Sequence, residues 1–265
     1  MDLEIRKHME NSCGDSSVGV QAFVSGGSYL FLLFNREALL VGMTLQRIGA
    51  RVYIKNVDTT GCERGYAREF IMSILRVLSP DLSCCFSIPK NEYIFNGSSL
   101  NKEKKIRGPR ELLEYWIGVF EEIYDNVHVW SNHHENISYP FKHMDEIVYF
   151  EDDPKDRLRK HFVGGLEEMF AALLCRTDFT NGSLVYGRSC KHGSGCMVEA
   201  SIGDVDDMES MLRKLDFSTH SKALESTKKF ISRFGLAIEY FPIKRFVKPQ
   251  EDDQACIILT PIRKI

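Results

Sequence analysis

The residue types best suited to chemistry lie in one stretch, where an aromatic strand end leads into small hydroxyl residues and then lysines. The stretch, residues 93–105, reads Tyr-Ile-Phe-Asn-Gly-Ser-Ser-Leu-Asn-Lys-Glu-Lys-Lys. Small residues let backbone N–H groups approach a phosphate, and lysines neutralise its charge. Pro109 suits the first turn of a following helix, whose positive dipole end would lie nearby. The pattern favours a phosphorylated cofactor; the alternative is a polar loop between a strand and a helix, with its aromatic residues in the core.

Coenzyme A is a cofactor that this stretch fits, because it joins phosphates to an adenine ring and a pantetheine arm. The latter two need flat apolar walls, which Tyr93, Phe95 and Tyr115 are suited to supply. The stretch is neither a Walker loop (Gly-x-x-x-x-Gly-Lys-Ser/Thr) nor a dinucleotide fingerprint (Gly-x-Gly-x-x-Gly). The sequence also has no Gly-x-Ser-x-Gly elbow, which counts against a hydrolase.

Residues 93–116 resemble the fungal histone H3 lysine acetyltransferases that were first named as regulators of Ty transposition. That family carries Tyr-Leu-Phe, Ser-Ser-Lys-Asn, a Lys-His pair and a Trp-Trp pair at the same intervals, and the metazoan CREB-binding-protein acetyltransferases share a looser version. Three more segments match in order: Val-Asp-Thr-Thr-Gly at 57–61, Phe-Glu-Asp-Asp-Pro-Lys-Asp-Arg-Leu at 150–158, and Asn-Gly-Ser-Leu-Val at 181–185. Together these segments span roughly half of the chain.

The resemblance implies a histone acetyltransferase that transfers the acetyl group of acetyl-CoA to lysines of histone H3, by direct attack of the lysine amine. It implies that the acetyl-CoA site is lined by Phe86, Tyr93, Ile94, Phe95, Ser98, Lys104, Lys105 and Tyr115. Trp116 matches an aromatic residue beside the acetyl group and the substrate lysine. The acidic residues that the family needs for activity match Asp58, Asp152 and Asp153, and Lys155 matches a lysine that becomes acetylated.

The sequence departs from the family pattern at three positions of this site. Leu100 replaces the lysine of Ser-Ser-Lys-Asn, Lys105 replaces a histidine, and Tyr115 replaces the first tryptophan. Lysine keeps a donor near phosphate, and tyrosine keeps a flat wall. The loss of a lysine at position 100 is expected to weaken cofactor binding. A second interpretation follows from these departures, namely a non-catalytic module on a decayed acetyltransferase fold that binds histones or chaperones.

The paired carboxylates of Asp152 and Asp153 suit the removal of a proton from the substrate. A lysine ammonium has a pKa of about 10.4 and must lose its proton before it attacks a thioester. Repulsion between adjacent carboxylates raises one pKa, although an extended pair points to opposite faces. The alternative is a helix opening, because Asp before Pro154 is typical of an N-cap.

The elements that position these residues follow from hydrophobic periodicity and turn signals. The patterns predict strands at 21–34 (broken at Gly26-Gly27), 38–44, 50–57, 83–88 and 255–261, and helices at 65–78, from Pro109 to about Asp125, and at 154–175, 205–215 and 221–234. The first 17 or so residues are polar and expected to be frayed. The fold class expected is α/β, a mixed central sheet flanked by helices with a helical C-terminal half, in a single domain over residues 1–265.

The composition limits the cellular compartments and the classes of partner that we expect for this protein. A net charge of -3 argues against general nucleic-acid binding, and the polar N-terminus holds no apolar signal segment. No apolar run is long enough to span a membrane. We expect a nuclear protein whose partners are histone H3 with H4 and histone chaperones. No metal is expected, because Cys190, His192 and Cys196 supply three ligands where a structural zinc site needs four.

Overall fold

The computed structural model describes residues 16–48, 51–62, 65–77, 83–87, 93–131, 183–191 and 201–243, with isolated positions at 161, 163–165 and 168. The predictions for residues 150–158, for the 154–175 helix and for the 255–261 strand therefore lie outside the described residues, or almost entirely so.

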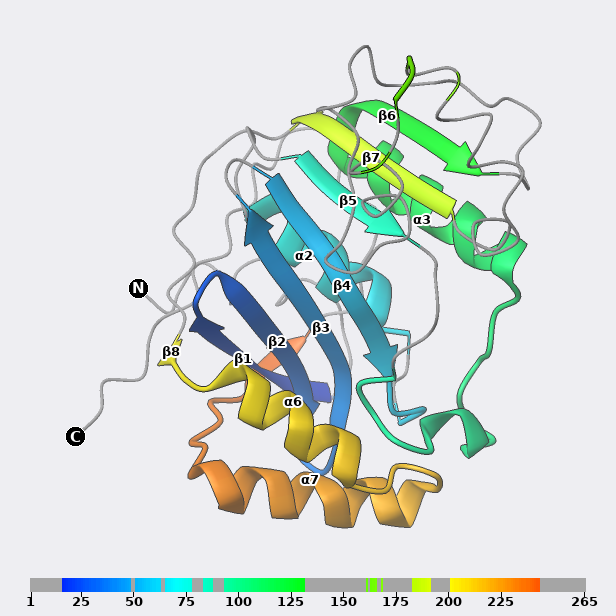
Figure 1. The fold of residues 1–265 in the computed structure, drawn as a ribbon. Coiled ribbons are helices and arrows are strands. Elements are labelled where there is room, and N and C mark those ends of the chain that lie inside the picture. The colour runs from blue at the N-terminus through cyan, green and yellow to red at the C-terminus, as the bar shows by residue number, and fades with distance from the viewer. Residues whose placement is uncertain are drawn as a thin grey trace.

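A mixed sheet organises the described residues, and Figure 1 shows it running obliquely across the molecule. Its strand order is β6-β7-β5-β4-β3-β2-β1-β8, and β9 also pairs with β1. The strands are β1 Ser16–Ser25, β2 Ser28–Asn35, β3 Leu39–Ile48, β4 Arg51–Thr59, β5 Ser83–Ser87, β6 Tyr124–Ser131, β7 Ser183–Cys190, β8 Ser201–Ile202 and β9 Phe241–Ile243.

The first four strands form an antiparallel meander. Gly26 and Gly27 both have positive φ (55° and 86°) and make the two-residue turn between β1 and β2, at the point where the predicted 21–34 strand is broken. β4 then pairs in parallel with β5, which pairs antiparallel with β7. Ser16 and Ser17 pair with β9, so the last residues of the stretch expected to be frayed belong to the sheet.

Helices cover both faces of this sheet. Their bounds are α2 Ala67–Val77, α3 Pro109–Ile123, α6 Val205–Lys214 and α7 His220–Phe234, with a 3-10 turn, η1, at Ser98–Leu100. In Figure 1, α2 and α3 lie behind the sheet, whereas α6 lies in front of β1 and β2 and α7 runs along its lower edge. Apolar side chains of β2 and β3 fill the core between these layers. The expected mixed α/β class is confirmed.

The C-terminal half differs in part from the expected helical half. Helices α6 and α7 lie where periodicity predicts them, but β7, β8 and β9 show that this half also completes the sheet. Helix α3 ends at Ile123, because the next residue, Tyr124, is already extended (φ −115°, ψ 144°) and begins β6. Among the described residues, no helix has the length and apolar character needed to cross a membrane.

Candidate functional site

Two of the motif segments meet at the carboxylate of Asp58, at the end of β4. Its Oδ2 accepts a hydrogen bond from the backbone N–H of Phe95 (3.0 Å), and its Oδ1 accepts from Lys104 Nζ (2.5 Å) and from the N–H of Thr59 (2.8 Å). Lys104 also donates to Ser98 Oγ (2.7 Å). The side chains of Asp58, Lys104 and Ser98 are buried or nearly so. Their hydrogen bonds join segments that are 37 to 46 residues apart in the sequence.

The residues that follow Asp58 fix the same loop from a second side. Asn101 Nδ2 donates to the carbonyl of Thr60 (2.8 Å), and Thr60 Oγ1 donates to the carbonyl of Leu39 in β3 (2.7 Å). Gly61 has φ +86°, and a Cβ there would lie 2.7 Å from Asn101 Nδ2. The segment 57–61 therefore acts as a backbone cradle for the loop that follows β5.

A third support comes from the linker between α6 and α7, which sequence reasoning missed. The N–H of Phe217 donates to the carbonyl of Asn96 (2.9 Å), and its buried ring lies 4.9 Å from that of Phe95. Hydrogen bonds from Lys222 of α7 and from Ser218 of the linker hold the pKa of Asp216, also in the linker, well below its usual range. No periodicity marks Phe217 as a loop contact, because it follows the end of a helix and its partner lies far away in sequence.

The predicted aromatic residues of α3 lie in two different environments. Tyr115 is half-buried, and its ring lies beneath two guanidinium groups, that of Arg107 at 4.2 Å and that of Arg68 at 5.6 Å from the ring centroid. The side chain of Trp116 is 1% exposed and packs edge-on against Tyr115 and Phe120. Tyr115 thus reaches the surface with its cationic neighbours, whereas Trp116 belongs to the core.

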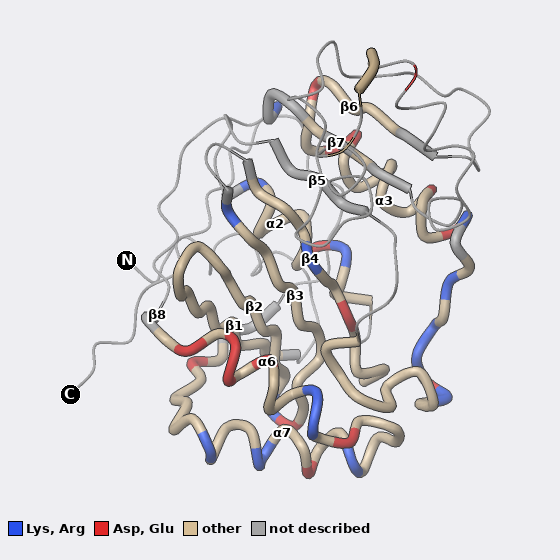
Figure 2. The backbone as a smooth tube through the Cα atoms, viewed as in Figure 1, with Lys and Arg blue, Asp and Glu red and all other residues tan. Residues whose placement is uncertain are grey.

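The surface around this loop combines exposed apolar groups with cations. Leu100 and Ile106 are 72% and 66% exposed, and Tyr93 is also exposed. Figure 2 shows Lys and Arg positions following one another along the segment between η1 and α3. Lys104 and Arg110 are paired with Asp58 and Glu114, but within the described part of the chain Lys102, Lys105 and Arg107 have no carboxylate partner. Apolar and cationic groups side by side fit a ligand with a flat ring and phosphates.

The remaining predicted cofactor residues lie close to the same loop or beside it in the sheet. Ile94 is buried and, like Phe95, faces Gly42 of β3, where an added Cβ would lie 2.8 Å from the Phe95 ring. Phe86 lies in β5, where its backbone is registered with Ile54 of β4 and Val185 of β7. Asp152, Asp153 and Lys155 lie outside the described residues, so the predictions for them are unchanged.

Cys62 makes a contact with α7 that the sequence did not reveal. Its Sγ lies 3.4 Å from Nδ1 of His220, and the same ring nitrogen lies 3.8 Å from Oε2 of Glu103. Burial raises the pKa of the Cys62 thiol, a hydrogen bond with Thr60 lowers it, and the charge of Glu103 raises it. A nucleophile relay needs the two ring nitrogens of a histidine to face different partners. Here Nδ1 of His220 faces both the thiol and the Glu103 carboxylate, so the arrangement is not that of an activated nucleophile.

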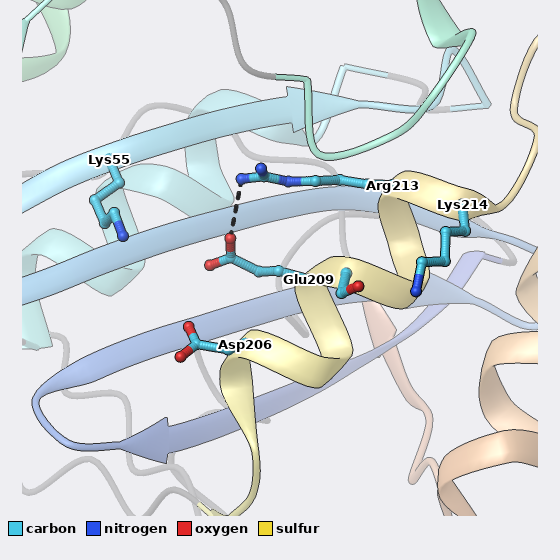
Figure 3. A pocket seen from close by; sticks show the side chains of 6 residues that line it. Lys55, Asp206, Glu209, Arg213 and Lys214 are labelled. Carbon is cyan, nitrogen blue, oxygen red and sulfur yellow. Dashed lines mark hydrogen bonds and ion pairs between the residues drawn. The ribbon is translucent and has the colours of Figure 1, made fainter.

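A separate cavity of about 430 Å³ lies between α6 and β4 (Figure 3). It is lined by Lys55, Asp206, Glu209, Ser210, Arg213 and Lys214, and Arg213 donates to Glu209 at 3.2 Å. The lining includes none of the predicted site residues. In the described ranges, no three His, Cys, Asp or Glu side chains gather as metal ligands, and His192 and Cys196 fall outside those ranges.

Comparisons with known proteins place the fold. No protein-family model matches the sequence, and no curated protein matches it. Among solved structures, the crystal structure of Rtt109 from Aspergillus fumigatus matches with a TM-score of 0.66 and 13% sequence identity. The match covers 91% of this chain and 99% of that chain. The chain therefore shares the mixed α/β fold of Rtt109, which confirms in three dimensions the resemblance to the fungal H3 acetyltransferases that its motifs indicate.

Proposed function

We propose that this chain is a nuclear protein-lysine acetyltransferase that uses acetyl-CoA and modifies histone H3 in its complex with H4. One observation carries the proposal. In a chain with the fold of Rtt109, the carboxylate of Asp58 binds both the backbone of Phe95 and the amine of Lys104. Segments that match the family separately in sequence therefore lie together, as a shared cofactor site requires.

The side chains around the loop fit acetyl-CoA as a co-substrate. Tyr93, Leu100 and Ile106 offer exposed apolar surface to an adenine ring or a pantetheine arm. Among the described residues, Lys105 and Arg107 have no carboxylate partner, and they lie just before α3, which begins at Pro109 and adds its positive dipole end. Acetyl-CoA supplies the activated acetyl group, and these residues supply binding and orientation.

The chemical step is a direct transfer to nitrogen. The substrate lysine loses a proton, and its neutral amine attacks the thioester carbonyl carbon. The carbon–sulfur bond breaks, and the departing coenzyme A thiolate takes up the second proton, which the nitrogen loses as the amide forms. Asp152 and Asp153 are the carboxylates proposed to attract the ammonium and accept its proton. On the family resemblance, Trp116 is proposed to contribute the wall beside the acetyl group; its side chain is 1% exposed and packs against Tyr115 and Phe120.

For Asp58 the contacts favour a positioning role. Its oxygens accept hydrogen bonds from Phe95, Lys104 and Thr59, and its side chain is buried. A carboxylate held in this way orients a loop and does not approach a substrate amine. Loss of activity on its substitution would then arise from a displaced cofactor loop.

The experiment that tests the proposal measures transfer of label from radioactive acetyl-CoA to histone H3–H4, with and without histone chaperones. The expected result is label on H3 that increases when a chaperone presents the histone. A double variant, Asp152→Asn with Asp153→Asn, should lose most of this activity while keeping its fold. Absence of transfer with every chaperone, from folded protein, would contradict the proposal.

The chaperone partnership has its own test. A histone delivered by a chaperone implies a complex of the enzyme with the histone-bearing chaperone. Such a complex should co-purify from extract at physiological salt. Recovery of the chain without any histone chaperone would remove this part of the proposal and leave the acetylation untouched.

The second candidate function is a non-catalytic module that binds histones or chaperones. The observation in its favour is Leu100, which is 72% exposed at a position where the family pattern has lysine. Acetyl-CoA at millimolar concentration should raise the melting temperature by several degrees if the chain is an enzyme. No thermal shift would favour the module.

Autoacetylation of Lys155 belongs to the same proposal. Acetylation removes the positive charge beside Asp152 and Asp153 and frees a carboxylate for the substrate lysine. After the protein is incubated with acetyl-CoA, mass spectrometry should find the peptide that contains Lys155 heavier by one acetyl group. An unmodified peptide in an enzyme that is active on histone would show that the modification does not belong to this chain.

A further inference from the structure

The guanidinium group of Arg107 is the cation of the loop that is best prepared to hold an anion. Its central carbon lies over the ring of Tyr115, 4.2 Å from the ring centroid. A ring contact of this kind restrains a side chain that is otherwise costly to order. The N–H donors at the edge of the guanidinium group stay available, because within the described residues no carboxylate is within ion-pair distance of it.

Three other cations of this part of the described chain are already paired with carboxylates. Lys104, which the family pattern assigns to the cofactor, gives its charge to Asp58 and a further hydrogen bond to Ser98. Arg68, on the Tyr115 ring at 5.6 Å, pairs with Glu122. Arg110 pairs with Glu114. Of the cations in this part of the described chain, Arg107, Lys102 and Lys105 are therefore the ones left without a carboxylate partner for an approaching phosphate.

We propose that Arg107, held on the ring of Tyr115, is the anchor for the phosphates of the acetyl-CoA nucleotide, and that Lys104 is not. This inference rests on the proposed function, since it names the residue that holds the co-substrate. Arginine binds phosphate through two parallel N–H donors, which sets the orientation of the nucleotide as well as its affinity. Tyr115, which replaces a tryptophan of the family pattern, then serves as the platform of this arginine.

Calorimetry tests the inference by measuring the affinity of the chain for three ligands: acetyl-CoA, S-acetylpantetheine and adenosine 3′,5′-bisphosphate. Arg107→Gln should raise the Kd for acetyl-CoA and for the bisphosphate by about tenfold or more. It should leave the Kd for S-acetylpantetheine, which lacks the nucleotide, within about twofold. Arg107→Lys keeps the charge but not the paired donors, so its Kd for acetyl-CoA should lie between that of the wild-type chain and that of Arg107→Gln.

Matched variants separate the anchor from the general charge of the surface. Arg110→Gln removes the same charge three residues away, from an arginine that is paired with Glu114, and should change the Kd for acetyl-CoA by less than about twofold. Tyr115→Leu removes the platform but no charge, and should weaken nucleotide binding in the same direction as Arg107→Gln. Both arginines are exposed, so the variants at these two positions are expected to fold. Tyr115 packs against the core, so a thermal unfolding curve must show that Tyr115→Leu is folded before its affinity is compared.

The outcomes distinguish this inference from the proposed function. Equal affinities of Arg107→Gln and Arg110→Gln for acetyl-CoA would overturn the anchor, while label transfer to H3 would still support the enzyme. An Arg107-dependent affinity without any acetyl transfer would support the anchor and overturn the enzyme. If the wild-type chain binds none of the three ligands but binds polyglutamate through Arg107, the surface is a docking site for an acidic protein and the anchor is wrong.

Discussion

The Oδ1 atom of Asp58 and the Nζ atom of Lys104 lie 2.5 Å apart, in an ion pair whose side chains are only 6% and 11% exposed. Each partner has further hydrogen bonds, from the N–H of Phe95 to the carboxylate and from the ammonium to Ser98. The pair thus holds the loop after β5 against the end of β4. These contacts support the proposed positioning role of Asp58, and they involve two residues that the motifs associate with catalysis and with cofactor binding.

The free energy of unfolding should reveal this pair in a double-mutant cycle. Lys104→Met leaves the carboxylate of Asp58 buried without its cation, and should lower the stability by about 3 kcal/mol. Asp58→Asn should also destabilise the chain, and the double variant should lose less than the sum of the two. Urea unfolding measures all three, and Arg110→Met, from an exposed pair, should cost less than about 1 kcal/mol. Additive losses at Asp58 and Lys104 would show that the contact contributes nothing.

Gly61 is expected to tolerate no side chain, for two separable reasons. Its φ of +86° costs an L-residue roughly 1–2 kcal/mol. In addition, a Cβ would lie 2.7 Å from Nδ2 and 2.9 Å from Cγ of Asn101, which is itself bound to Thr60. Gly65 has almost the same φ, +90°, with nothing within 4 Å of an added Cβ. Chemical denaturation should therefore show a clearly larger loss for Gly61→Ala than for Gly65→Ala, and equal losses would contradict the crowding at Asn101.

Phe217→Ala should loosen the loop that carries Phe95. Truncation of a fully buried phenylalanine costs about 3–5 kcal/mol. Phe230→Ala, in α7, removes an equally buried ring that packs against Phe234. Hydrogen exchange read by mass spectrometry should show faster exchange of the 93–101 peptide in Phe217→Ala than in Phe230→Ala. Similar exchange in both variants would mean that the α6–α7 linker does not support the loop.

The thiol of Cys62 should react slowly, and it should lose its proton at a higher pH than an ordinary cysteine thiol. Its pKa is raised chiefly by burial, so the thiolate forms only at a higher pH than in an unfolded chain. The folded state then holds a proton that the unfolded state has lost, so this thiol contributes stability below its ordinary pKa and loses it as the pH rises through the folded value. Alkylation mapped to the peptide that contains Cys62 should be slow in native protein at pH 8 and fast in denaturant. Equal rates in both states would contradict the burial.

The sequence by itself determined the local elements and the order of the motifs. The helix that begins at Pro109, the turn at Gly26-Gly27 and the helices near Val205 and Ser221 follow from proline, glycine and apolar spacing, which act over a few residues. The resemblance of residues 57–61 and 93–116 to one family was also readable from residue types and intervals. These features depend on neighbours in the chain, so periodicity and turn chemistry suffice to predict them.

Only the tertiary structure decided which charged side chains form ion pairs. Lys104 looks like one of several free lysines in the sequence, but the path of the chain brings it to Asp58, while Arg107 lies on Tyr115 with no carboxylate partner among the described residues. The same is true of Phe217, whose backbone N–H finds the carbonyl of Asn96. Burial makes each of these pairings favourable, because a buried donor or charge must find a partner, and partners 46 or more residues apart leave no trace in local spacing.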